Sequence, residues 1–225
     1  MPTPLHLKAP FLPGKFYHMV CKSIDGILLF NDPDDIDVYR ERLYHFTQRF
    51  METWSYSLLP NHTHHIIKLH ELNIISENFS EEEHPESTIA TKAFLADQSN
   101  NLLFDRMIER QMNSFLVSYA TYHNNKYGRQ GGLFQKPFKR IELCDESHLQ
   151  QAIIYVHANA QRHGLVKDFI HHKHSSYAGI LFSDNPHVAG KEVMEFFGGR
   201  RQFERLHKDQ AAYYYSNNVP SSKLE

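Results

Sequence analysis

Apolar residues alternate with polar ones in some segments and recur at helical spacing in others, and this change of period separates strands from helices. Strand patterns cover residues 16–22, 54–59 and 62–67, and a tight turn at Pro60-Asn61 joins the last two. Residues 133–143 are mostly extended, and the proline within them indicates an edge strand or a bulge. We therefore expect four strands.

Helical spacing of apolar residues predicts further elements between and after these strands. The predicted helices cover residues 35–52, 101–126, 147–164, 191–197 and 200–215. Ser147 and Gln150 have the spacing of a capping box at the start of the third helix. Gly128 and Gly164 mark the ends of the second and third helices.

The order strand–helix–strand–strand–helix–strand–helix is typical of an α+β fold, and we expect an antiparallel sheet with helices on one face. Residues 71–100 are polar and acidic, so we expect a flexible and partly helical insertion there. The sequence thus predicts one domain over residues 1–174 and a helical C-terminal extension over residues 175–225.

The composition is ordinary for a globular protein, with 225 residues of which 41% are hydrophobic and 22% charged. Cys21 and Cys144 lie far apart, which argues against a disulfide scaffold or a cysteine-built zinc site and fits a reducing compartment. The first residues lack the apolar run of a signal peptide, and no stretch is long enough to span a membrane. We therefore expect a cytoplasmic protein without a membrane partner.

The net charge of −2 does not indicate a nucleic-acid binder, but the charge is unevenly distributed. One stretch without any acid contains five cations, Lys126, Arg129, Lys136, Lys139 and Arg140. A polyanion would bind where positive charge is locally concentrated. The plainer interpretation is a solvated basic loop.

Two histidines in the second strand of the hairpin are candidates for a metal site. His62 and His64 are two residues apart, so they project from the same face of the strand and can share one metal ion. A half-buried strand can also carry two histidines without any chemistry. A second histidine cluster, at residues 171–174, lies in a polar stretch and is interpreted as a surface loop.

Tyr155 and Asn159 lie four residues apart on the helix over 147–164, beside its apolar stripe, so both are directed toward the sheet. Asn159 can supply a third ligand to a divalent ion, and such an ion polarises a phosphodiester oxygen. A tyrosine beside it can act as a covalent nucleophile. The alternatives are that Tyr155 packs in the core and that Asn159 forms a hydrogen bond at the helix end.

Four segments in this order resemble the single-tyrosine HUH transposases, the transposases of the smallest bacterial insertion sequences. The REP-associated tyrosine transposases are the most similar branch. The matching segments cover residues 58–64, 122–139, 155–166 and 196–203. They extend over most of the chain.

The resemblance implies a ferredoxin-like α+β fold and a Mg²⁺- or Mn²⁺-dependent enzyme of the bacterial cytoplasm. Such an enzyme cleaves and rejoins single-stranded or hairpin-associated DNA through a 5′-phosphotyrosine, as a monomer or a homodimer. His62, His64 and Asn159 match the metal ligands, and Tyr155 matches the nucleophile. The expected DNA contacts are Lys126, Arg129, Lys136, Lys139, Arg140 and Arg162.

Two other functions stay open. A domesticated relative would bind hairpin DNA without cleaving it, and the family pattern is altered at Thr63 and His65, where apolar residues are usual. A metal-dependent hydrolase of a small substrate would need a general base near the ion. No acid stands at an obvious spacing from His62 and His64.

Overall fold

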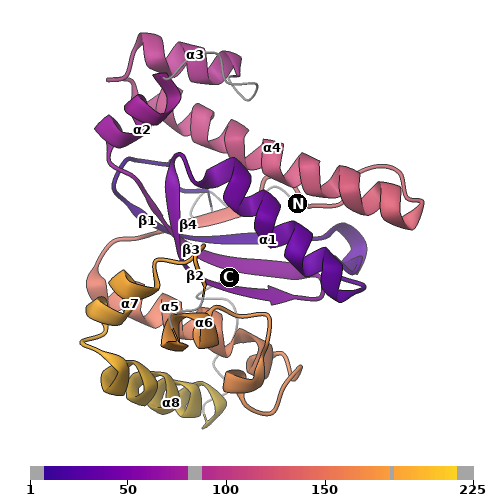
Figure 1. Ribbon diagram of the computed structural model, residues 1–225, viewed down its shortest axis with the longest axis vertical. Helices are drawn as coiled ribbons and strands as arrows, with labels where there is room; N and C mark the ends of the chain where they lie inside the picture. Colours follow the sequence, from indigo (N-terminus) through magenta and orange to yellow (C-terminus); the bar gives the residue numbers. More distant parts are fainter. Residues whose placement is uncertain (1–7, 81–87, 183–184, 217–225) are drawn as a thin grey trace.

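The computed structural model describes residues 8–80, 88–182 and 185–216. Four antiparallel strands form one sheet in the order β2-β3-β1-β4 (Figure 1). The strands are β1 (Phe16–Lys22), β2 (Met51–Leu59), β3 (His62–Leu69) and β4 (Lys139–Leu143). The predicted α+β architecture is confirmed, and β4, which follows Pro137, is the expected edge strand.

Helices cover both faces of this sheet, so the prediction of helices on one face is wrong. Figure 1 shows α1 (Pro33–Thr47) and α4 (Asn101–Tyr127) above the sheet and α5 (Glu146–Arg162) below it. The cause is visible in β3, where Ile67 packs into the core under α1 and α4 and Ile66 packs into the core under α5. A strand that is buried on both faces lacks the alternation from which a solvent face is inferred.

The remaining helices belong to the insertion and to the C-terminal extension. They are α2 (Leu72–Ser80), α3 (Ile89–Ala96), α6 (Tyr177–Phe182), α7 (Gly190–Phe196) and α8 (Arg200–Ser216). The insertion is partly helical as expected, and its acidic run at residues 81–86 lies outside the described residues. Residues of α6, α7 and α8 share a hydrophobic core with α5. In the described part of the chain, no helix has the length and apolar character needed to cross a bilayer.

The start of α5 differs from the prediction. Asp145 is the N-cap, and its side chain accepts a hydrogen bond from the backbone N–H of His148. The capping box predicted at Ser147 and Gln150 is therefore wrong, because an aspartate two residues earlier already caps the helix.

The helix α1 ends earlier than its apolar spacing predicts. The helix ends at Thr47, and Met51 already belongs to β2. The prediction that residues 48–52 are helical is therefore wrong. Phe50 continues the apolar helical spacing, but its ring is fully buried within the turn that leads into the strand. Phe50 is apolar because it is buried in the tertiary structure, not because it belongs to the apolar stripe of α1. The apolar spacing in the sequence therefore continues past the end of the helix.

Candidate functional site

The helix α5 lies across the face of the sheet that carries His62 and His64. The amide nitrogen of Asn159 lies 3.1 Å from Nε2 of His64. The ring of Tyr155, one helical turn earlier, lies 5.9 Å from the ring of His64 between centroids. The structure therefore brings together three of the residues singled out in the sequence, and it does so because residues four apart on a helix cover the same neighbouring strand.

His62 lies at the open side of this group. Its ring centroid is 5.1 Å from that of His64, and its Nδ1 lies 2.7 Å from Oδ1 of Asn61. His62 is partly exposed, whereas His64 is only 1% exposed. The ring of His163, just beyond the end of α5, lies 5.0 Å from His62. His163 was not among the residues predicted for the site.

His18 on β1 is a second residue that sequence reasoning missed. Its Nε2 lies 2.9 Å from Nδ1 of His64, and its ring contacts the ring of Tyr155 at 5.9 Å between centroids. The side chain is 2% exposed. The strand pattern placed His18 on a strand, but only the register of β1 on β3 shows that it reaches His64.

The three imidazoles of the site are neutral near pH 7. Burial lowers the pKa of His18 and of His62 to about 4, and it holds the pKa of His64 well below its usual 6.5. The positive charges of Lys22 and Lys139 also lower the pKa of His62. Neutral imidazoles keep a lone pair for a metal ion, so protons do not compete for the ligands at this pH.

The donor set fits a divalent ion. Oδ1 of Asn159 is buried without a hydrogen-bond partner. The amide nitrogen of Asn159 is the atom that faces Nε2 of His64, at 3.1 Å, so Oδ1 would join an ion held by Nε2 only after the amide turns about its last side-chain bond. Within the described residues, no three histidine, cysteine, aspartate or glutamate side chains are grouped to hold a metal, so an ion at this site would depend on the amide oxygen.

Tyr155 is enclosed within the site. It is 1% exposed, and its hydroxyl accepts a hydrogen bond of 2.9 Å from Nη1 of Arg162. The guanidinium also lies over the Tyr155 ring, 5.2 Å from its centroid. Arg162, predicted as a DNA contact, therefore lies directly at the candidate nucleophile. A phosphodiester could reach the Tyr155 hydroxyl only after a local opening of this region.

Two of the predicted DNA contacts, Lys126 and Arg140, form ion pairs with acids of the protein itself. Arg140 is 1% exposed and pairs with Asp105 at 2.9 Å and with Glu109 at 3.6 Å, so the prediction that it contacts DNA is wrong. The ammonium of Lys126 lies 2.8 Å from the buried carboxylate of Asp35, but Lys126 is itself exposed, so it stays a prediction as a DNA contact. Asp35 comes from α1, and Asp105 and Glu109 come from the first half of α4.

The other cations of the basic run face outward. Lys136 is exposed, and Arg129 is partly exposed and donates a hydrogen bond to Asn124 at 3.0 Å. Within the part of the chain that the structure describes, neither side chain contacts Tyr155. Both stay predictions as DNA contacts.

A basic rim borders the site. It consists of Lys22, Lys139 and His163, which all act electrostatically on His62. Lys22 lies opposite His62 in the pairing of β1 with β3, and Lys139 begins the strand on the other side of β1. Within the described residues, neither lysine has an acid at ion-pair distance. Lys22 is a further residue that only the strand register reveals.

The second histidine cluster, at residues 171–174, lies outside this site. His172 is partly buried, and its Nε2 contacts the carbonyl oxygen of Leu58 at 3.2 Å, next to the edge strand β2. His171 and His174 are exposed, which agrees with the predicted surface position.

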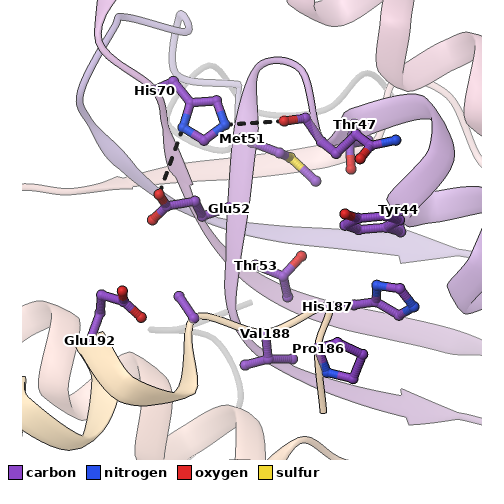
Figure 2. A pocket seen from close by; sticks show the side chains of 12 residues that line it. Tyr44, Thr47, Met51, Glu52, Thr53, His70, Pro186, His187, Val188 and Glu192 are labelled. Carbon is purple, nitrogen blue, oxygen red and sulfur yellow. Dashed lines mark hydrogen bonds and ion pairs between the residues drawn. The ribbon is translucent and has the colours of Figure 1, made fainter. Parts of the chain in front are cut away.

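A hollow of about 290 Å³ lies elsewhere, between α1, the edge of β2 and the segment that leads into α7. Figure 2 shows the ring of His70 beside the carboxylate of Glu52, and Nδ1 of His70 lies 3.8 Å from Oε1 of Glu52. Nε2 of His70 lies 3.2 Å from the carbonyl oxygen of Gln48. His187 and Glu192 line the same hollow. It contains neither Tyr155 nor the paired histidines, so it is separate from the candidate site.

The fold of this chain is similar to that of a solved structure, although its sequence matches no known family. No protein-family model matches the chain, and no curated protein matches it. Among solved structures, a REP-associated tyrosine transposase bound to a REP hairpin is similar, with a TM-score of 0.52 and 14% sequence identity. The similarity covers 77% of this chain and 83% of that chain. The chain therefore shares the fold of a tyrosine transposase.

Proposed function

We propose that this protein is a metal-dependent DNA strand transferase that cleaves and rejoins single-stranded or hairpin-associated DNA through Tyr155. The observation that carries the proposal is the position of Tyr155 and Asn159, one helical turn apart on α5 and both against His64. The shared fold with a transposase bound to a DNA hairpin supports DNA as the partner.

In this proposal, His62, His64 and Asn159 hold Mg²⁺ or Mn²⁺, which when bound polarises a phosphodiester oxygen. The Tyr155 oxygen attacks the phosphorus, its proton leaves to solvent, and the 3′-oxygen of the upstream nucleotide departs. The 5′-phosphate stays on the tyrosine. Arg162, 2.9 Å from the hydroxyl, favours the phenolate because an adjacent cation stabilises the charged form. A free 3′-hydroxyl then attacks the phosphotyrosine and restores the phenol.

One observation favours a second candidate, a relative that binds hairpin DNA with little or no cleavage. Tyr155 is 1% exposed, and its hydroxyl is held by Arg162. If this region does not open, a phosphodiester cannot reach the nucleophile, although the rest of the surface can still bind DNA.

A denaturing gel distinguishes these candidates. The protein is incubated with end-labelled single-stranded hairpin oligonucleotides and Mn²⁺, beside the Tyr155→Phe variant. We expect a protein–DNA band that survives denaturation, disappears with EDTA and is missing in the variant, because only the phenolic oxygen can form the covalent bond. The phenylalanine ring keeps the packing against His18 and His64, so the variant should still shift DNA in a native gel.

Persistence of the covalent band in Tyr155→Phe would exclude Tyr155 as the nucleophile. A native gel shift without any covalent band, over a broad pool of oligonucleotides, would establish the binding protein instead. Absence of both would overturn the proposal of a DNA partner.

A further inference from the structure

Both ring nitrogens of His64 are engaged, and this restricts where its proton can be. Nδ1 lies 2.9 Å from Nε2 of His18, and Nε2 lies 3.1 Å from the amide of Asn159. A neutral imidazole carries one N–H, and the nitrogen that carries it has no lone pair. His64 can bind a metal through Nε2 only when its proton is on Nδ1 and is donated to His18.

His18 is able to accept that proton. It is 2% exposed on β1 and stacks on His64 with ring centroids 5.1 Å apart. Burial favours the neutral ring, and the neighbouring His148 favours it further. A neutral ring with its own proton on Nδ1 has the Nε2 lone pair that His64 needs.

His62 also has a hydrogen-bond partner at Nδ1, which is the side chain of Asn61. Nδ1 of His62 lies 2.7 Å from Oδ1 of Asn61, the last residue of the turn before β3. An amide oxygen can only accept, so it fixes the proton on Nδ1 of His62 and leaves the Nε2 lone pair available.

We infer that His18 and Asn61 are positioning residues that hold His64 and His62 as their Nδ1–H tautomers, so that each presents Nε2 to a metal ion. The inference rests on the proposed function for its purpose, but the tautomers themselves can be measured without metal. Metal-bound histidines usually donate their second N–H to a carboxylate, a carbonyl or water. Here both acceptors are uncharged, so the tautomer is fixed without negative charge beside a bound phosphodiester.

The decisive measurement is long-range ¹H–¹⁵N NMR of the metal-free protein, which reads the tautomer of each histidine. We expect Nδ1–H for His62 and His64 in the unmodified chain. His18→Leu removes the acceptor and should convert His64 to Nε2–H or to a mixture, whereas His18→Gln supplies an amide oxygen and should restore Nδ1–H. Asn61→Ala, in a partly exposed turn, should affect His62 alone.

Binding of Mn²⁺ alone, followed by electron paramagnetic resonance, gives the second readout. His18→Leu and Asn61→Ala should each weaken Mn²⁺ binding by about 10- to 100-fold, the usual effect of removing such a partner. Val20→Ala is the matched control, because it removes packing directly opposite His64 in the strand pairing but no acceptor. It should leave the tautomers and the Mn²⁺ affinity unchanged.

Retention of the Nδ1–H tautomer of His64 in folded His18→Leu would overturn the role of His18. If His18→Leu does not fold, His18→Gln and Asn61→Ala still decide, since the first must keep and the second must lose the Nδ1–H form. Failure of the unmodified chain to bind Mn²⁺ would instead overturn the proposed metal-dependent function, while the tautomer measurement would still test the positioning residues.

Discussion

At the scale of single residues, three polar side chains explain an unusual feature of β3. Thr63 and His65 point away from the candidate site into the core under α1, where apolar residues would be expected. Both contact the hydroxyl of Tyr39, Thr63 at 2.8 Å and His65 at 3.1 Å, and they contact each other at 3.1 Å. The two hydroxyls and Nε2 of His65 therefore satisfy one another, whereas Nδ1 of His65 is buried without a hydrogen-bond partner.

The ion pairs of individual side chains also determine which cations can contact DNA. Lys126 and Arg140 are paired with acids, whereas Lys22 and Lys139 of the basic rim border His62. A lysine that neutralises a phosphate releases bound counterions, which makes DNA affinity dependent on salt.

We predict that Lys22→Gln and Lys139→Gln each weaken binding of single-stranded DNA and reduce the slope of log affinity against log salt by about 0.7. Fluorescence anisotropy over a series of salt concentrations measures both. Lys15→Gln, just before the opposite end of β1, is the matched control and should change neither. Equal slopes for all four proteins would show that DNA does not follow the basic rim.

At the scale of secondary-structure elements, a buried chain of hydrogen bonds fixes α8 against α5. Nδ1 of His207 donates to the carbonyl oxygen of Phe203 at 2.7 Å, so its Nε2 accepts from Nδ1 of His157 at 2.8 Å. Nε2 of His157 in turn accepts from the Ser176 hydroxyl at 2.8 Å. His157 lies between Tyr155 and Asn159 on α5, so the C-terminal extension supports the helix that carries the candidate site.

Replacing His207 by leucine leaves the buried N–H of His157 without an acceptor. We predict a loss of about 1–3 kcal/mol in the free energy of unfolding, measured by urea denaturation. Amide hydrogen exchange should also be faster in α5. Lys208→Ala, the next and exposed residue of α8, should have little effect on either measurement. Unchanged stability of His207→Leu would show that α8 is not coupled to α5 through this pair.

At the scale of the whole molecule, many histidines are buried in the neutral state. Burial lowers the pKa of His207 to about 4 and of His65 to about 3, and it holds the pKa of His157 well below 6.5. These residues lie on both sides of the sheet, so protonation would disrupt both cores.

We predict that the protein loses stability as the pH falls from about 6.5 to 4. In this range the unfolded chain binds protons on these histidines and the folded chain does not, so each contributes a slope of up to about 1.4 kcal/mol per pH unit. Urea denaturation at pH 7.5, 6.0 and 5.0 measures the slope. The His207→Leu variant should be less stable at pH 7.5 but show a shallower slope. Constant stability over this range would mean that the histidines are accessible to protons.

The sequence by itself determined the order of the elements, the antiparallel α+β fold and the pairing of Tyr155 and Asn159 on one helix. These features follow from local periodicity, which residues close in sequence report directly. The alternation of His62 and His64 is likewise a property of any strand.

Only the tertiary structure decided which further residues join the site and which cations form ion pairs. His18 and Lys22 join the site through the register of β1 on β3, and no local pattern encodes which residues of two strands meet. Lys126 and Arg140 form ion pairs with Asp35 and Asp105, which lie 91 and 35 residues away in the sequence, and the local charge of the basic run could not indicate these pairs. Periodicity is local, whereas register and charge pairing are long-range, and the composition of the site depends on the long-range contacts.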